Sequence, residues 1–132
     1  MRKIIFITSL LSTILLFSCS KPGDLTVQRA MNAYQSQNYE EALSAYTLLL
    51  EKEKSVSGRI NLLSSSARAK LQLEDFGGAV NDLRKAQAVK HPNVKVNAAN
   101  QLRILLQMTD IYAGKLNDYP RAFGLVEDAL KN

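Results

Sequence analysis

Few of the side chains that usually catalyse reactions occur in this sequence, and they do not form a recognisable catalytic set. The only histidine, His91, precedes Pro92 at the predicted end of a helix, where an imidazole commonly caps carbonyl groups. The serines at 64–66 have no nearby base and lack the strand-to-helix turn that exposes a hydrolase nucleophile. We therefore predict no catalytic residues and no enzymatic activity.

Acidic pairs and a glycine pair are the remaining candidates for chemistry. The acidic pairs are Glu40–Glu41, Glu51 with Glu53, and Glu74–Asp75. Two of them open predicted helices, where carboxylates stabilise the helix dipole. Gly77–Gly78 also begins a helix, but no strand precedes it and no Lys-Ser/Thr pair follows it, so a phosphate-binding loop is unsupported. With one cysteine and one histidine, the chain cannot form a disulfide within itself, a cysteine-based zinc cage or a multi-histidine site. The sequence predicts neither a metal nor a cofactor.

The N-terminus has the layout of a secretory signal peptide. Arg2 and Lys3 precede residues 4–20, which contain no charge, and this order of a basic and an apolar region is typical of exported proteins. The uncharged stretch of 17 residues lies at the lower limit for crossing a bilayer, so a transmembrane anchor is the alternative.

The end of this apolar stretch resembles the lipobox of bacterial lipoproteins. Leu16 lies three residues before Cys19, and the small Ser18 lies directly before it, although Phe17 is bulkier than the usual residue. The resemblance implies cleavage before Cys19 and acylation of this residue. Two or three acyl chains hold a protein on a bilayer, whereas one binds only marginally. Ser20, by the same resemblance, implies the outer membrane, facing the periplasm. The alternative is that Cys19 is an ordinary thiol.

Removal of the predicted signal peptide, residues 1–18, changes the charge and length of the chain. It would leave 114 residues with a formal net charge of +3, because Arg2 and Lys3 are lost. Residues 19–24 are then the lipidated cysteine and a short tether, and residues 25–132 are one helical domain. The remaining positive charge is small and scattered, so we predict no nucleic-acid partner.

Three segments of the domain share one pattern. Each has a polar residue, an aromatic residue, two variable residues, an alanine and an apolar residue, followed by apolar residues at helical spacing. The polar residues are expected to be N-caps, the alanines to let a neighbouring helix approach, and the aromatic rings to pack between paired helices. In chain order these sets are Asn38, Asp75 and Asp118; Ala42, Ala79 and Ala122; and Tyr39, Phe76 and Tyr119.

A further helical stretch precedes each of these segments. These stretches cover residues 25–37, 60–73 and 94–116, and breaks are predicted at Ser55–Gly58 and His91–Asn93. The domain is therefore expected to contain six helices in three antiparallel pairs. A generic six-helix bundle is the alternative, because helical periodicity suits both arrangements.

This arrangement resembles the tetratricopeptide-repeat (TPR) family over nearly all of residues 24–132. The three aromatic residues lie 37 and 43 positions apart, whereas the TPR period is about 34, so the connections or helices must be longer here. Ala30 and Ala67 occupy a position where the family has glycine or alanine, and Asp110 stands there in the third repeat. The resemblance implies an all-α fold, an α-solenoid of about three antiparallel helix pairs.

The TPR resemblance also implies a binding surface, because the first helices of the pairs line a concave groove in that family. An apolar anchor beside the charge of Arg68 could bind an extended peptide or a helix. The paired Lys and Asn residues with which some members clamp a C-terminal carboxylate are absent, so that mode is not expected. The corresponding groove residues in this sequence are Val27, Met31, Tyr34, Gln35, Asn61, Ser64, Arg68, Leu71, Gln107 and Ile111.

These features predict a membrane-anchored TPR-like lipoprotein that serves as an adaptor or scaffold for a protein or peptide partner in the bacterial cell envelope. The alternative is a structural subunit of a larger envelope complex, such as outer-membrane assembly or secretion machinery, that uses its end surfaces instead of the groove. Apolar residues of the last helix, including Phe123 and Leu130, suggest that the C-terminal end packs on a partner or on another copy of the chain.

Overall fold

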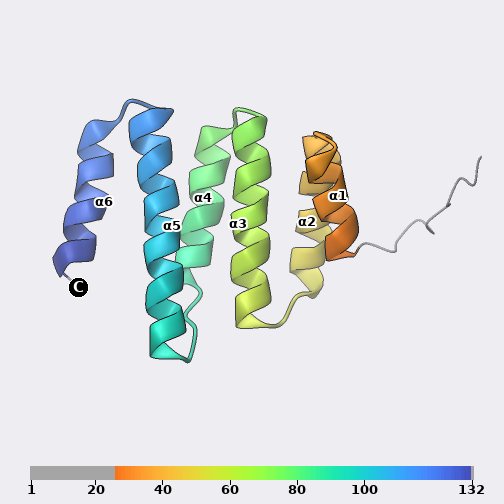
Figure 1. Ribbon diagram of the computed structural model, residues 1–132, viewed down its shortest axis with the longest axis horizontal. Helices are drawn as coiled ribbons and strands as arrows, with labels where there is room; N and C mark the ends of the chain where they lie inside the picture. Colours follow the sequence, from red (N-terminus) through yellow and green to blue (C-terminus); the bar gives the residue numbers. More distant parts are fainter. Residues whose placement is uncertain (1–25, 132) are drawn as a thin grey trace, which may run out of the picture.

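The computed structural model describes residues 26–131, which form six α-helices and no β-strand (Figure 1). The predicted signal peptide, Cys19, the short tether and Leu25 lie outside the described residues. The prediction of an all-α fold is therefore confirmed for this part of the chain. The helices are α1 (Val27–Gln35), α2 (Tyr39–Lys52), α3 (Val56–Gln72), α4 (Phe76–Ala88), α5 (Val94–Gly114) and α6 (Tyr119–Lys131).

The helices pack mainly against their neighbours in the chain, and the contact between α3 and α4 is the most extensive. Figure 1 shows α1 with α2 at one end of a row, α3 with α4 in the middle, and α5 and then α6 at the other end. The predicted break at Ser55–Gly58 is wrong, because α3 already begins at Val56. The Ser55 hydroxyl accepts the backbone N–H of Gly58 at 3.0 Å. This N-cap lets α3 begin about one turn before residue 60, where the sequence predicts its start.

The turns inside the three helix pairs share a left-handed residue. Gln37, Glu74 and Asn117 have φ angles of 62°, 60° and 52°, a region that costs residues other than glycine about 1–2 kcal/mol. The next residue in each case is an N-cap whose side chain accepts the backbone N–H three positions later, as the sequence predicted. These caps are Asn38, Asp75 and Asp118.

The predicted packing of the repeat alanines and aromatic rings is confirmed in most positions. All three alanines are buried. The Tyr39 ring meets Tyr34 edge-on with a centroid distance of 5.3 Å, and Phe76 packs on the core. The prediction for Tyr119 is wrong, because this side chain is 64% exposed. Its helix, α6, packs mainly against α5, so no third helix is available to cover the ring.

The apolar core consists of two clusters that meet at α3. One cluster joins α1 and α2 to Leu62 of α3, and the other joins α3, α4, α5 and α6. Leu50 packs against both clusters. The largest side chains that are almost fully enclosed are Ile60, Leu83, Ile104 and Met108.

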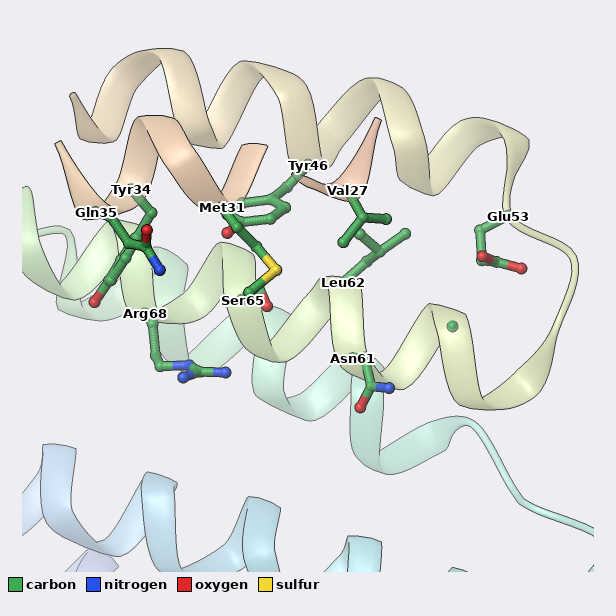
Figure 2. A pocket seen from close by; sticks show the side chains of 11 residues that line it. Val27, Met31, Tyr34, Gln35, Tyr46, Glu53, Asn61, Leu62, Ser65 and Arg68 are labelled. Carbon is green, nitrogen blue, oxygen red and sulfur yellow. The ribbon is translucent and has the colours of Figure 1, made fainter. Parts of the chain in front are cut away.

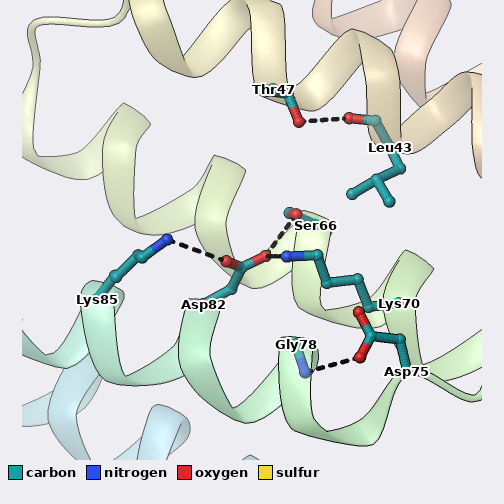
Figure 3. A network of polar contacts seen from close by, with 8 residues as sticks. All are labelled: Leu43, Thr47, Ser66, Lys70, Asp75, Gly78, Asp82 and Lys85. Carbon is teal, nitrogen blue, oxygen red and sulfur yellow. Dashed lines mark hydrogen bonds and ion pairs between the residues drawn. The ribbon is translucent and has the colours of Figure 1, made fainter.

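A buried polar network ties α3 to α4 (Figure 3). Asp82 of α4 accepts a hydrogen bond from the Ser66 hydroxyl at 2.6 Å, and the ammonium of Lys70 lies 2.8 Å from the same carboxylate oxygen. The ammonium of Lys85 lies 3.9 Å from the other oxygen. Because these partners occupy the carboxylate, its burial does not leave an unpaired charge.

The first turn of α4 contains two glycines that should respond differently to substitution. A Cβ atom on Gly77 would meet nothing within 4 Å, whereas one on Gly78 would collide with the Asp75 carboxylate that caps the helix. We expect Gly77→Ala to stabilise the fold by about 0.5 kcal/mol and Gly78→Ala to be less stable than Gly77→Ala by about 1 kcal/mol. Urea unfolding of the two variants measures this difference, and equal stabilities would contradict the cap geometry.

Candidate partner-binding groove

A cavity of about 510 Å³ lies between α1, α2 and α3 (Figure 2). Helix α1 forms one wall, α3 forms the opposite wall, and Tyr46 of α2 contributes its ring from behind. Glu53, in the connection between α2 and α3, closes one end. The lining residues are Val27, Met31, Tyr34, Gln35, Tyr46, Glu53, Gly58, Asn61, Leu62, Ser65 and Arg68.

A second, smaller cavity of about 130 Å³ adjoins the first along α3. Arg68 lines both cavities, so the two share this residue. The second cavity extends the concave surface from α3 to α5. It is lined by Ser64, Ala67, Arg68, Leu71, Leu83, Gln107, Asp110, Ile111 and Lys115.

All ten residues transferred from the TPR positions line one of these two cavities. The four predicted residues of α1 line the first cavity together with Asn61 and Arg68 of α3. Arg68 also lines the second cavity, together with the other four predicted residues, which are Ser64, Leu71, Gln107 and Ile111. Gln107 and Ile111 of α5 therefore face the same cavity as α3. We call the combined surface of the two cavities the groove.

Sequence reasoning missed several lining residues of the groove. Three of them, Gly58, Leu62 and Ser65, lie ten, six and three positions before Arg68 on α3. They are three or four positions apart from one another, and this helical spacing could have revealed them. Tyr46 and Glu53 lie on the second helix and its following connection, where nothing in the sequence pattern marks them. In the second cavity the residues missed are Ala67, Leu83, Asp110 and Lys115.

The middle of the first cavity is apolar, and the Tyr46 ring lies behind its apolar side chains. Met31 lies one turn after Val27 on α1, and both side chains are partly exposed beside the buried Leu62. Burial raises the pKa of the Tyr46 phenol, and the positive charge of Arg68 and a hydrogen bond with the Ser65 side chain partly oppose this rise. The phenol therefore stays neutral at physiological pH and provides a polar group without a charge.

The two ends of the first cavity carry opposite charges. Arg68 lies at the end near Gln35, and Glu53 lies at the other end (Figure 2). The Glu53 carboxylate accepts the backbone N–H of Ser55 at 2.7 Å, and hydrogen bonds from Ser55 lower the pKa of this carboxyl. Glu53 is therefore anionic at neutral pH.

Two residues that line the second cavity have buried polar atoms without a partner in the described part of the chain. The Ser64 hydroxyl and the Gln107 side-chain oxygen are both buried and form no hydrogen bond there. Buried polar groups are normally satisfied by protein or water. The Ser64 and Gln107 oxygens are exceptions to this rule, and because they are shielded from solvent they do not form part of the cavity surface.

The chain matches no protein-family model, and no curated protein or solved structure is significantly similar to it. Its function is therefore inferred from the residues of the groove and from the chemistry that they offer.

The sequence predicts that His91 caps helix carbonyls or is solvated, and the structure shows a partly exposed imidazole in a local hydrogen bond. The imidazole accepts the backbone N–H of Asn93 at 3.0 Å and does not cap helix carbonyls, because α4 ends three residues earlier, at Ala88. Between residues 26 and 131, no group of three or more His, Cys, Asp and Glu side chains is arranged to hold a metal ion. None of the helices described in this range combines the length and apolarity needed to cross a membrane.

Proposed function

We propose that this protein is an acyl-anchored, TPR-like adaptor of the bacterial cell envelope whose groove binds a segment of a partner protein. In this proposal Cys19 carries the lipid, residues 20–24 tether the domain to the outer membrane, and α1, α3 and α5 present the groove towards the periplasm. The three helix pairs form a short α-solenoid, in which the first helix of each pair faces the partner.

The observation that supports this proposal best is the position of the ten groove residues. The TPR resemblance of the sequence implies these ten positions, and all of them line the two cavities that extend across α1, α3 and α5. A generic bundle gives no reason for these spacings to converge. The repeated left-handed residue in all three turns also favours a repeat architecture.

A second candidate function is that of a structural subunit that assembles through its end surface. Tyr119, Phe123 and Leu130 lie at helical spacing on α6, and all three side chains are mainly exposed. Large exposed apolar patches often mark interaction sites. In this case the groove would be unoccupied in the assembly.

Two triple variants distinguish the groove from the end surface. Replacing Met31, Tyr34 and Arg68 with alanine removes apolar anchors and the cation from the first cavity, and we expect partner recovery to fall at least tenfold, since hot-spot truncations cost about 2 kcal/mol or more. Replacing Tyr119, Phe123 and Leu130 with alanine should leave recovery unchanged. The measurement is quantitative mass spectrometry after crosslinking in native membranes, with folding checked by circular dichroism.

Two outcomes of this experiment contradict the proposal. Loss of the partner only in the α6 variant would indicate assembly through the end surface. Recovery of wild-type protein in the soluble fraction without detergent would contradict the lipid anchor, for which Cys19→Ala is the matched control. We expect this variant alone to leave the membrane.

A further inference from the structure

The Arg68 guanidinium forms no hydrogen bond or ion pair with a side chain of the described region, whereas several other cationic side chains there do. Several of the others bind carboxylates, as in the pairs of Arg29 with Glu41 and Arg121 with Asp118. Arg103 donates to amide oxygens. No carboxylate between residues 26 and 131 lies within ion-pair distance of the Arg68 guanidinium, although this side chain borders both cavities.

Glu53 is the complementary charge at the far end of the first cavity. No Lys or Arg cation of the described residues lies within ion-pair distance of its carboxylate, although the positive charge of Arg59, which donates to the Glu53 backbone carbonyl, helps to lower the pKa of this carboxyl. The carboxylate instead lies over the first turn of α3, where the absence of a side chain on Gly58 leaves room for it. The hydrogen bond from Ser55 fixes it in this position.

The separation of the two charges sets the length of a segment that could bind both. Gly58, beside Glu53, and Arg68 are ten positions apart on α3, which corresponds to about 15 Å of helix. An extended chain covers this distance in about five residues. A helix of that length is about 10–12 Å wide with its side chains, so it would lie largely outside a cavity of about 510 Å³.

We propose that the groove selects an extended segment of its partner that carries a carboxylate at one end, apolar side chains in the middle and a cation at the other end. This inference rests on the proposed function. The carboxylate pairs with Arg68, the apolar side chains lie against Met31 and Leu62, and the cation pairs with Glu53. Recognition depends on the two charges being of opposite sign and about five residues apart.

Three pools of six-residue peptides test this selection with the full-length chain in nonionic detergent. The peptides have blocked ends and four central positions randomised among Leu, Phe and Ser. The terminal side chains are Glu and Lys in the first pool, Glu at both ends in the second, and Lys at both ends in the third. We expect the wild type to bind the first pool about fivefold more tightly than either other pool, as measured by fluorescence anisotropy, because each exposed ion pair contributes up to about 1 kcal/mol.

Charge reversal of the groove should change the preferred pool. We expect Arg68→Glu to favour the pool with Lys at both ends and Glu53→Lys to favour the pool with Glu at both ends. The double variant should again prefer the mixed pool. Glu53→Gln keeps an acceptor for the Ser55 N–H, so the fold should be unaltered. This variant should no longer prefer a Lys at the peptide end that faces residue 53.

Lys95→Glu is the matched control for Arg68→Glu, because both replace a cation with an anion. Lys95 is exposed on α5 and lines neither cavity. This variant should keep the wild-type preference. Tight binding of all three pools alike, or an unchanged preference in Arg68→Glu, would overturn the charge selection and leave groove binding intact. If the wild type binds no pool and the groove triple variant still recovers the cellular partner, both this inference and the proposed function fail.

Discussion

Replacing Asp82 with alanine is expected to lower the free energy of unfolding by about 3 kcal/mol, because removal of one partner from a buried ion pair leaves the other charge uncompensated. The Asp82 side chain is 6% exposed, and that of Lys70 is 20% exposed. The ammonium of Lys70 would lose its closest carboxylate, and the Ser66 hydroxyl would lose its acceptor. Chemical denaturation followed by circular dichroism measures the change.

Glu51→Ala is the control for the loss of one carboxylate from a helix. Glu51 is exposed on α2, so its removal should change stability by less than about 0.5 kcal/mol. If the two variants are equally stable, the buried network contributes nothing. Replacing Ser66, Lys70 and Asp82 together with apolar residues should restore most of the loss, because a well-packed apolar substitute is often as stable as a buried pair.

Truncation of Ile104 to alanine is the second substitution for which we expect a large effect. This side chain is fully buried on α5, in the cluster that joins the last two helix pairs. Its removal should destabilise the domain by about 3–4 kcal/mol, since it loses apolar burial and leaves a cavity. Ile104→Val should cost only about 1 kcal/mol, so the two variants form a graded series.

Leu106→Ala tests whether the position on α5 determines this effect. Leu106 lies two residues after Ile104, on a different face of the helix, and is 53% exposed. Its truncation should change stability by less than about 0.5 kcal/mol. Similar losses at both positions would mean that Ile104 is not packed as the structure shows.

The features that could be predicted from the sequence are those that nearby residues determine. The N-caps Asn38, Asp75 and Asp118 depend on side chains that bond within one turn. The alanines of the three repeats follow from the helical period, which identifies the face that must pack. The ten positions implied by the TPR resemblance on α1, α3 and α5 all line the two cavities, because the helices are regular and each turn moves the chain by a fixed distance.

The features that could not be predicted depend on contacts between distant segments. Tyr46 reaches the groove from α2, and Glu53 reaches it through the bend before α3. The pairing of Asp82 with Lys70 needs two helices in register, which periodicity alone does not specify. Tyr119 was placed incorrectly because its spacing matches the other repeats, although its helix has fewer neighbours.

Helix α3 holds residues of both core clusters, of both cavities and of the buried polar network. It cannot unfold alone without disrupting each of these, so the groove exists only while the whole domain is folded. A molecule that binds the groove binds the native state and not the unfolded chain, and mass action then shifts the folding equilibrium. Occupancy of this surface should thus be transmitted to the melting temperature of the entire domain, including helices that the ligand never touches.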